Sequence, residues 1–267
     1  CRAFEATGQF SMSMQSKATR ANRTDAGWDV EYSKNQVINH LHTKNLVLAG
    51  GAREVGERFD HFLSEYDLSS EALNAYCLSS ELLKADGRAG PLQTIAQTNN
   101  PKITIIGGSH SAISSAAKCL TSDIQFHKHA IQILHRSPMY VTFDSVAAAQ
   151  DCGFTDFGPD DICPHTHRVF ALKGFRLDSR DLLMSVQGYS AVQGEDRVQL
   201  RAMPDMSPQE VKGALLEADL VISALGYSPN FVPLFSAASN HQIKLNAPDF
   251  VDANSALLNS QSKAIPN

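Results

Sequence analysis

The fold of this chain is decided by the stretch Lys102-Ile-Thr-Ile-Ile-Gly107-Gly108-Ser109-His110-Ser111-Ala112-Ile113-Ser-Ser-Ala116-Ala117. Its isoleucine-rich beginning predicts a short buried parallel strand, and the small and apolar residues after the glycines recur at helical spacing. The two glycines let the backbone turn tightly and approach an anion, which the first N–H groups of the helix can bind. The stretch therefore predicts a phosphate-binding turn between a strand and a helix.

This turn nearly matches the dinucleotide fingerprint G-x-G-x-x-G/A, with Gly107 at the first position and Ala112 at the last. Ser109 stands where the middle glycine belongs, so the interpretation depends on the strand before the turn and the helix after it. The residues that we expect to contact a dinucleotide are Gly107, Gly108, Ser109, His110, Ser111 and Ala112. Ser109 and Ser111 would hydrogen-bond to phosphate, and His110 either covers the turn or faces the nicotinamide. The alternative is a strand–helix turn that binds no ligand.

Length and composition describe a globular protein without unusual partners. The 267 residues can bury a sizeable core, as one large domain or two ordinary ones. The net charge of −5 gives no electrostatic case for binding nucleic acid, and no apolar run is long enough to span a bilayer. Five cysteines without paired spacing favour a reducing compartment, and we expect a cytoplasmic protein. The chain opens on Cys1-Arg-Ala-Phe-Glu, which is no signal peptide, and the missing initiator methionine suggests that the gene begins upstream.

Further strands and helices alternate around the glycine turn. Apolar runs predict strands over 130–134, 197–201 and 219–226, and a helix is expected over 178–186. Ser207, followed by Pro208 and by Glu210, is a typical helix start, and that helix should run to about residue 217. Strands alternating with helices predict an α/β fold with a Rossmann-like doubly wound parallel sheet.

The N-terminal part has a different pattern. Alternating residues predict a β-hairpin formed by 28–32 and 37–41. The run Asn45-Leu-Val-Leu-Ala-Gly-Gly51 predicts a short buried strand that ends in two glycines. The polar stretch 97–101 marks a boundary before the strand at 102–106.

Arg136 follows the strand predicted over 130–134. NAD-specific proteins place an acidic residue there, which binds the ribose hydroxyls. A guanidinium can instead pair with the 2′-phosphate of NADPH through two hydrogen bonds. Arg136 therefore favours NADPH, and the alternative is a solvated surface arginine.

Together these residues resemble the two-dinucleotide-domain flavoproteins, specifically the flavin-dependent N-hydroxylating and related NADPH-dependent monooxygenases. The likeness rests on segments spread through the chain, which are Asn45–Gly51, Gly107–Ala112, His135–Ser137, Asp219–Pro229 and Ala264–Asn267. In that family a first G-x-G-x-x-G holds the FAD pyrophosphate, and nothing before residue 50 matches it. We therefore expect an internal portion of a longer flavoprotein. Leu225 stands where the family usually has threonine.

The resemblance implies a domain plan and a chemistry. Residues 1–98 would form a partial FAD-binding domain, 99–232 the NADPH-binding domain, and 233–267 a return segment towards the flavin domain. Gly226 and Tyr227 would join the glycine turn in holding the nucleotide. NADPH would reduce FAD by hydride transfer, and the reduced flavin would activate O₂ to oxygenate a small molecule, an amine or a similar nucleophile. The resemblance names no catalytic acid or base.

Three other interpretations remain open or are disfavoured by the residues. A non-catalytic nucleotide-binding module would also explain the missing flavin fingerprint. A pyridine-nucleotide-dependent reductase would need a reactive cysteine pair, which the five cysteines do not supply. A zinc site is not expected, because the spacing of the thiols and imidazoles in one loop, Cys152, Cys163, His165 and His167, fits no standard ligand set.

Overall fold

A computed structural model describes residues 11–84, 90–171, 173–189, 194–236 and 241–243. The chain divides into two compact units, the first made of 1–53 and 229–267 and the second of 54–228. Residues 54–98, expected with the partial flavin domain, thus pack in the same unit as residues 99–228, and residues 229–232, expected with the NADPH domain, fall in the first unit. The functional identity of each unit stays a prediction. Among the described residues, no helix has the length and apolarity needed to cross a bilayer.

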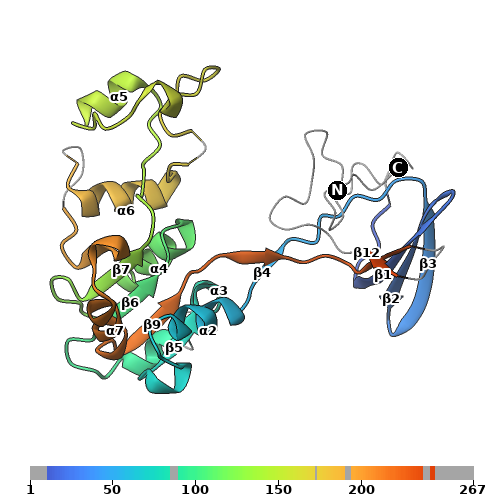
Figure 1. Ribbon diagram of the computed structural model, residues 1–267, viewed down its shortest axis with the longest axis horizontal. Helices are drawn as coiled ribbons and strands as arrows, with labels where there is room; N and C mark the ends of the chain where they lie inside the picture. The colour runs from blue at the N-terminus through green and yellow to red at the C-terminus, as the bar shows by residue number, and fades with distance from the viewer. Residues whose placement is uncertain (1–10, 85–89, 172, 190–193, 237–240, 244–267) are drawn as a thin grey trace. The chain divides into compact units, whose positions relative to one another are not determined.

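Unit 2 is built on a five-stranded parallel sheet with the order β5-β9-β6-β7-β8 (Figure 1). Its strands are β5 (Tyr76–Leu78), β6 (Ile103–Ile106), β7 (Ile131–His135), β8 (Val198–Ala202) and β9 (Leu220–Ser223). Both neighbours of β6 run parallel to it, with Ile105 opposite Ile133 on β7 and Ile222 on β9. The predicted α/β fold with a Rossmann-like parallel sheet is confirmed.

Helices cover both faces of this sheet because alternate residues of each strand point to opposite sides. Ile103 and Ile105 belong to a core shared with α3 (Ser79–Lys84), α4 (His110–Leu120) and α6 (Leu177–Gln187). Ile106 belongs to a second core, which includes buried residues of α2 (Glu57–Ser64) and α7 (Pro208–Leu216). The sheet is therefore enclosed, as its continuous apolar strands require.

The predicted start of α7 is confirmed in detail. The Ser207 hydroxyl accepts a hydrogen bond from the Glu210 N–H, and the Glu210 carboxylate accepts one from the Ser207 N–H at 2.7 Å. Pro208 occupies the first turn, where no N–H is needed. The remaining short helices of unit 2 are α5 (Val146–Asp151) and 3₁₀ turns at Ser70–Ala72, Pro91–Ile95, Pro159–Asp161 and Met203–Asp205.

The described part of unit 1 is a second sheet with the order β12-β11-β1-β2-β3. It comprises β1 (Ser16–Thr24), β2 (Gly27–Lys34), β3 (Val37–Thr43), β11 (Leu234–Ser236) and β12 (Gln242–Ile243). The predicted hairpin is confirmed as β2 and β3, and β1 adds a strand that the sequence did not indicate. Two short strands, β4 (Ala52–Glu54) and β10 (Tyr227–Pro229), form a separate pair.

The prediction of a strand at Asn45–Gly51 is wrong. Residues 45–51 pair with no strand, and Val47 is 86% exposed. Leu46 and Leu48, on either side of Val47, pack against the small core around Trp28. The alternate leucines give this segment the apolar pattern of a strand. It has no neighbouring strand as a hydrogen-bonding partner among the described residues. The segment 264–267 lies outside the described residues.

Candidate functional site

The glycine turn lies at the carboxyl end of β6, where the strand order reverses. The next strand in the chain, β7, flanks β6 on one side, and the later strand β9 flanks it on the other. In open parallel sheets, ligands bind outside the carboxyl ends of the strands at such a switch point. The turn is therefore placed where this fold binds nucleotides.

Gly107 and Gly108 meet the two neighbouring strands closely. Gly107 has φ +139°, a conformation that favours glycine, and a β-carbon there would collide with the carbonyl oxygen of Ala224 beyond β9. A β-carbon on Gly108 would lie 3.2 Å from that of His135 at the end of β7. Gly108 is nevertheless exposed on its outer side, so its backbone remains accessible to a ligand.

The start of α4 presents free hydrogen-bond donors. Ser109 is the N-cap with extended backbone, and its side chain makes no capping hydrogen bond. No described residue accepts a hydrogen bond from the backbone N–H groups of Gly108, Ser109, His110 or Ser111. Four free N–H groups at a helix N-terminus favour an anion such as a pyrophosphate. Ala112 is fully buried and packs the helix against the sheet.

His110 is the exposed first residue of α4. Its imidazole stacks on the Phe175 ring, with centroids 4.7 Å apart and planes 25° from parallel. Phe175 is itself buried in the core of unit 2. The imidazole is thus supported on one face and exposed elsewhere.

Arg136 projects from the end of β7, one residue after His135. The His135 Nδ1–H donates to the Ser137 carbonyl oxygen at 2.9 Å, which fixes the bend of the chain around Arg136. The Arg136 guanidinium donates to the Glu65 carboxylate at 2.6 Å and lies 5.6 Å from the centre of the Phe62 ring. Arg136 is therefore an exposed arginine with a defined partner rather than a freely solvated one.

The sequence did not indicate the residues that α2 contributes to this edge of the sheet. The Arg58 guanidinium donates to the Leu225 carbonyl oxygen at 3.1 Å, and Glu65 pairs with Arg136. A cavity of about 370 Å³ lies between α2 and the strand ends, lined by Glu57, Arg58, His61, Phe62, Glu65, Arg136 and Leu225. Glu65 lies 71 residues from Arg136 and Arg58 lies 167 residues from Leu225, and no sequence motif marks either pair.

Gly226 lies two residues beyond Ala224, with φ +89° and the Arg58 guanidinium against it. It therefore shares the strand end that Gly107 contacts. Tyr227 is 40% exposed, and among the described residues no hydrogen bond or ring contact links it to the turn. The structure thus brings Gly226 near the glycine turn and does not join Tyr227 to it.

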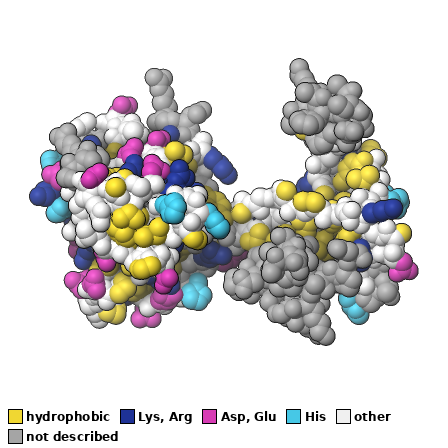
Figure 2. All heavy atoms as spheres, turned by 90° about the horizontal axis from the view of Figure 1, so that it is seen from above, with side chains coloured by type: hydrophobic (Ala, Val, Ile, Leu, Met, Phe, Trp, Pro, Cys, Tyr) yellow, Lys and Arg dark blue, Asp and Glu magenta, His cyan; other side chains and the backbone are white. Residues whose placement is uncertain are grey.

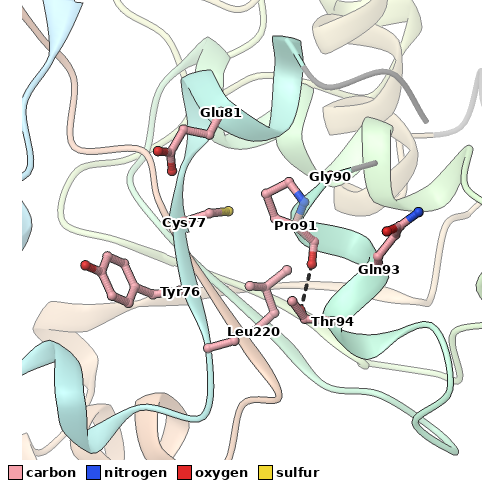
Figure 3. A pocket seen from close by; sticks show the side chains of 9 residues that line it. Tyr76, Cys77, Glu81, Gly90, Pro91, Gln93, Thr94 and Leu220 are labelled. Atoms are coloured by element: carbon pink, nitrogen blue, oxygen red, sulfur yellow. Dashed lines mark hydrogen bonds between the residues drawn. The ribbon is translucent and has the colours of Figure 1, made fainter. Parts of the chain in front are cut away.

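A larger cavity, of about 650 Å³, lies at the sheet edge beside β5 (Figure 3). Cys77 points into it, and burial together with the charges of Glu81 and Glu54 raises the pKa of its thiol to about 12. Burial likewise raises the pKa of Cys119 to about 12, with a further contribution from Cys77. Both thiols are neutral at physiological pH, so neither is a nucleophile for thiol–disulfide chemistry.

The electrostatic surroundings favour local rather than broad attraction of an anion. On the face of unit 2 seen in Figure 2, acidic and basic side chains are interspersed, and no extended basic patch appears. No group of three or more described histidine, cysteine or acidic residues is arranged to hold a metal ion. An anionic ligand would therefore depend on the α4 N-terminus and on single arginines.

No protein-family model matches the chain. A curated relative, CMP-5′-(3-aminopropyl)phosphonate hydroxylase from Streptomyces rubellomurinus, is 27% identical over 150 residues. The match covers 55% of this chain and 34% of the relative. The aligned part thus spans about a third of that enzyme's length.

Solved structures of monooxygenases align with this chain. DfoA, the cadaverine monooxygenase of desferrioxamine biosynthesis in Erwinia amylovora, solved with FAD, aligns with a TM-score of 0.51 over 95% of this chain and 62% of its own, at 13% identity. L-Lysine 6-monooxygenase from Pseudomonas syringae aligns with a TM-score of 0.46 over 91% of this chain and 58% of its own, at 18% identity. The chain has the α/β fold of DfoA, so the resemblance read from the sequence is confirmed at the level of the fold.

Proposed function

We propose that this chain contains the NADPH-binding domain of a flavin-dependent monooxygenase. The observation that carries the proposal is the turn 107–111, whose free N–H groups lie at the switch point of a parallel sheet. Side chains at Gly107 and Gly108 would meet Ala224 and His135, so glycine at both positions keeps the turn against the sheet. The fold shared with DfoA, an enzyme solved with FAD, supports the same class.

The residues of the chain have separate roles in this proposal. The N–H groups at the start of α4 bind the pyrophosphate, and the hydroxyls of Ser109 and Ser111 add hydrogen bonds to it. Arg136, at the end of the next strand, pairs with the 2′-phosphate. Bound NADPH supplies a hydride, and the protein supplies orientation.

The described residues do not fit a flavin. The described part of unit 1 contains strands and no helix, so it offers no glycine turn at a helix N-terminus for the FAD pyrophosphate. We therefore assign no step on this chain to flavin. An expressed chain of residues 1–267 should be colourless, and a yellow protein with stoichiometric FAD would contradict this assignment.

The substrate class proposed is a small molecule with a primary amine. The support is that the chain aligns with a cadaverine monooxygenase, and that the curated relative is named for an aminopropyl compound. No described residue is assigned to the amine.

The experiment is an NADPH titration by isothermal calorimetry of the parent chain and of Gly108→Val. The valine side chain would press against His135, displace the turn from the sheet edge and so weaken binding at least about tenfold. Gly194→Val is the matched control, since Gly194 is exposed with nothing within 4 Å of an added β-carbon. Gly108→Ala is a milder second variant, and thermal unfolding would check that each protein is folded. Equal affinity in all four proteins, or no binding by the parent, would overturn the proposal.

A further inference from the structure

The ion pair between Glu65 and Arg136 places a carboxylate on the residue proposed to read the 2′-phosphate. Glu65 Oε2 accepts from Arg136 Nη2 at 2.6 Å, and Glu65 Oε1 lies 3.4 Å from the His61 imidazole. Both side chains are partly exposed, Arg136 by 58% and Glu65 by 38%. The pair is thus accessible to a ligand, and Glu65 is the C-cap of α2, a helix that the fingerprint does not include.

We propose that Glu65 is a specificity-determining residue that competes with the nucleotide 2′-phosphate for Arg136. The inference rests on the proposed NADPH site. A phosphate dianion that pairs with Arg136 must displace the Glu65 carboxylate or lie close to it, and like charges at that distance repel. Glu65 therefore weakens NADPH binding.

The same carboxylate has the opposite relation to NADH. The ribose of NADH carries a 2′-hydroxyl, which can donate a hydrogen bond to a carboxylate, as acidic residues do in NAD-specific sites. Arg136 then keeps its partner, and no charge pair is broken. Glu65 and Arg136 together bring the affinities for the two nucleotides closer to each other.

The surroundings of Arg136 limit how far its guanidinium can move away from Glu65. Its guanidinium lies over Phe62, which is only 2% exposed and is fixed in the second core of unit 2. His135, one residue earlier, is held by its hydrogen bond to Ser137 and packs beside Gly108. The arginine therefore stays near both the carboxylate and the glycine turn.

The test compares Glu65→Gln with the parent in calorimetric titrations with NADPH and with NADH. Removing the charge of an exposed pair partner should raise NADPH affinity about two- to tenfold. NADH affinity should be unchanged or up to about threefold weaker, so the ratio of the two affinities rises. The rise should shrink at high salt, since the groups are exposed.

The matched control is Glu57→Gln, which removes the same charge from the same helix and the same cavity. Glu57 makes no ion pair with a described residue, so its replacement should raise both affinities equally or change neither. In an Arg136→Ala background, Glu65→Gln should change the ratio much less. A ratio that stays constant in Glu65→Gln, or that rises equally without Arg136, would overturn the inference.

These outcomes separate the inference from the proposed function. If the parent binds NADPH and loses affinity on Gly108→Val, the nucleotide site stands whatever Glu65 does. If the parent binds neither nucleotide, the proposed function fails and the inference fails with it.

Discussion

Gly107 at the end of β6 packs against Ala224 beyond the end of β9, so closely that a β-carbon on the glycine would lie 3.2 Å from that of Ala224 and collide with its carbonyl oxygen. The Ala224 N–H donates to the Ile106 carbonyl oxygen at 2.8 Å, which ties the same two strands together next to the turn. The geometry of the turn is thus fixed by the sheet. The free N–H groups of α4 are presented by a rigid edge rather than by a loop.

Gly107→Ala should destabilise unit 2. The backbone at this position has φ +139°, which costs a non-glycine residue roughly 1–3 kcal/mol, and the contact with Ala224 adds to that cost. Urea unfolding would measure the free energy of unfolding of the variant. Gly194→Ala, at an exposed position with open space, should change it by less than about 0.5 kcal/mol. Equal stability of the two variants would show that the turn adopts another conformation.

Arg136→Ala should weaken NADPH binding about five- to fiftyfold and leave NADH binding almost unchanged. A charge-assisted hydrogen bond to the 2′-phosphate is lost, and part of its value is offset because the Glu65 pair no longer has to be broken. Binding would be measured by calorimetry. Arg168→Ala is the control, because Arg168 is also an exposed arginine in an ion pair, with Asp144 at 3.2 Å. Equal weakening of both nucleotides would show that Arg136 supports the fold instead.

Cys163 should be alkylated faster than Cys77 and Cys119 in the native protein. Hydrogen bonds from Thr166, from its side chain first, and the charge of Arg168 lower the pKa of the Cys163 thiol. Burial raises the pKa of the other two to about 12. The thiolate is the reactive form, so at pH 7–8 a lowered pKa increases reactivity and a raised one suppresses it.

Peptide mapping after brief iodoacetamide treatment would measure this order. Thr166→Val should slow the alkylation of Cys163, and unfolding in urea should remove the difference between the three cysteines. Rapid native labelling of Cys77 would contradict the buried position of its thiol.

The parallel sheet could be predicted because its strands are marked by local sequence patterns. Ile103–Ile106 and Leu220–Ser223 are short runs of apolar residues, and Ser207 with Glu210 is a local capping pattern. Each of these signals involves neighbours in sequence. The structure therefore confirms them to within three residues, the largest difference being the end of the strand predicted over 219–226 and observed over Leu220–Ser223.

Features made by distant residues could not be predicted in the same way. Helix α2 has only three buried apolar residues, Phe59, Phe62 and Leu63, and its importance comes from the sheet edge it covers. Glu65 and Arg136 are 71 residues apart, and nothing in either local sequence indicates that they meet. The apolar run at 45–51 was wrongly predicted to be a strand, because a strand also requires a neighbouring strand to pair with, and the local sequence does not show whether one is present.

The most direct test of the nucleotide site is the response of individual backbone amides to NADPH in a ¹⁵N-labelled chain. The largest chemical-shift changes should fall on Gly108, Ser109, His110 and Ser111, whose N–H groups are free of described partners and are proposed to bind the pyrophosphate. Smaller changes should appear around Arg136, and NADH should reproduce the first set more fully than the second. Saturating NADPH that leaves these four amides unmoved, or that shifts only amides of unit 1, would contradict the claim that this turn is the nucleotide site.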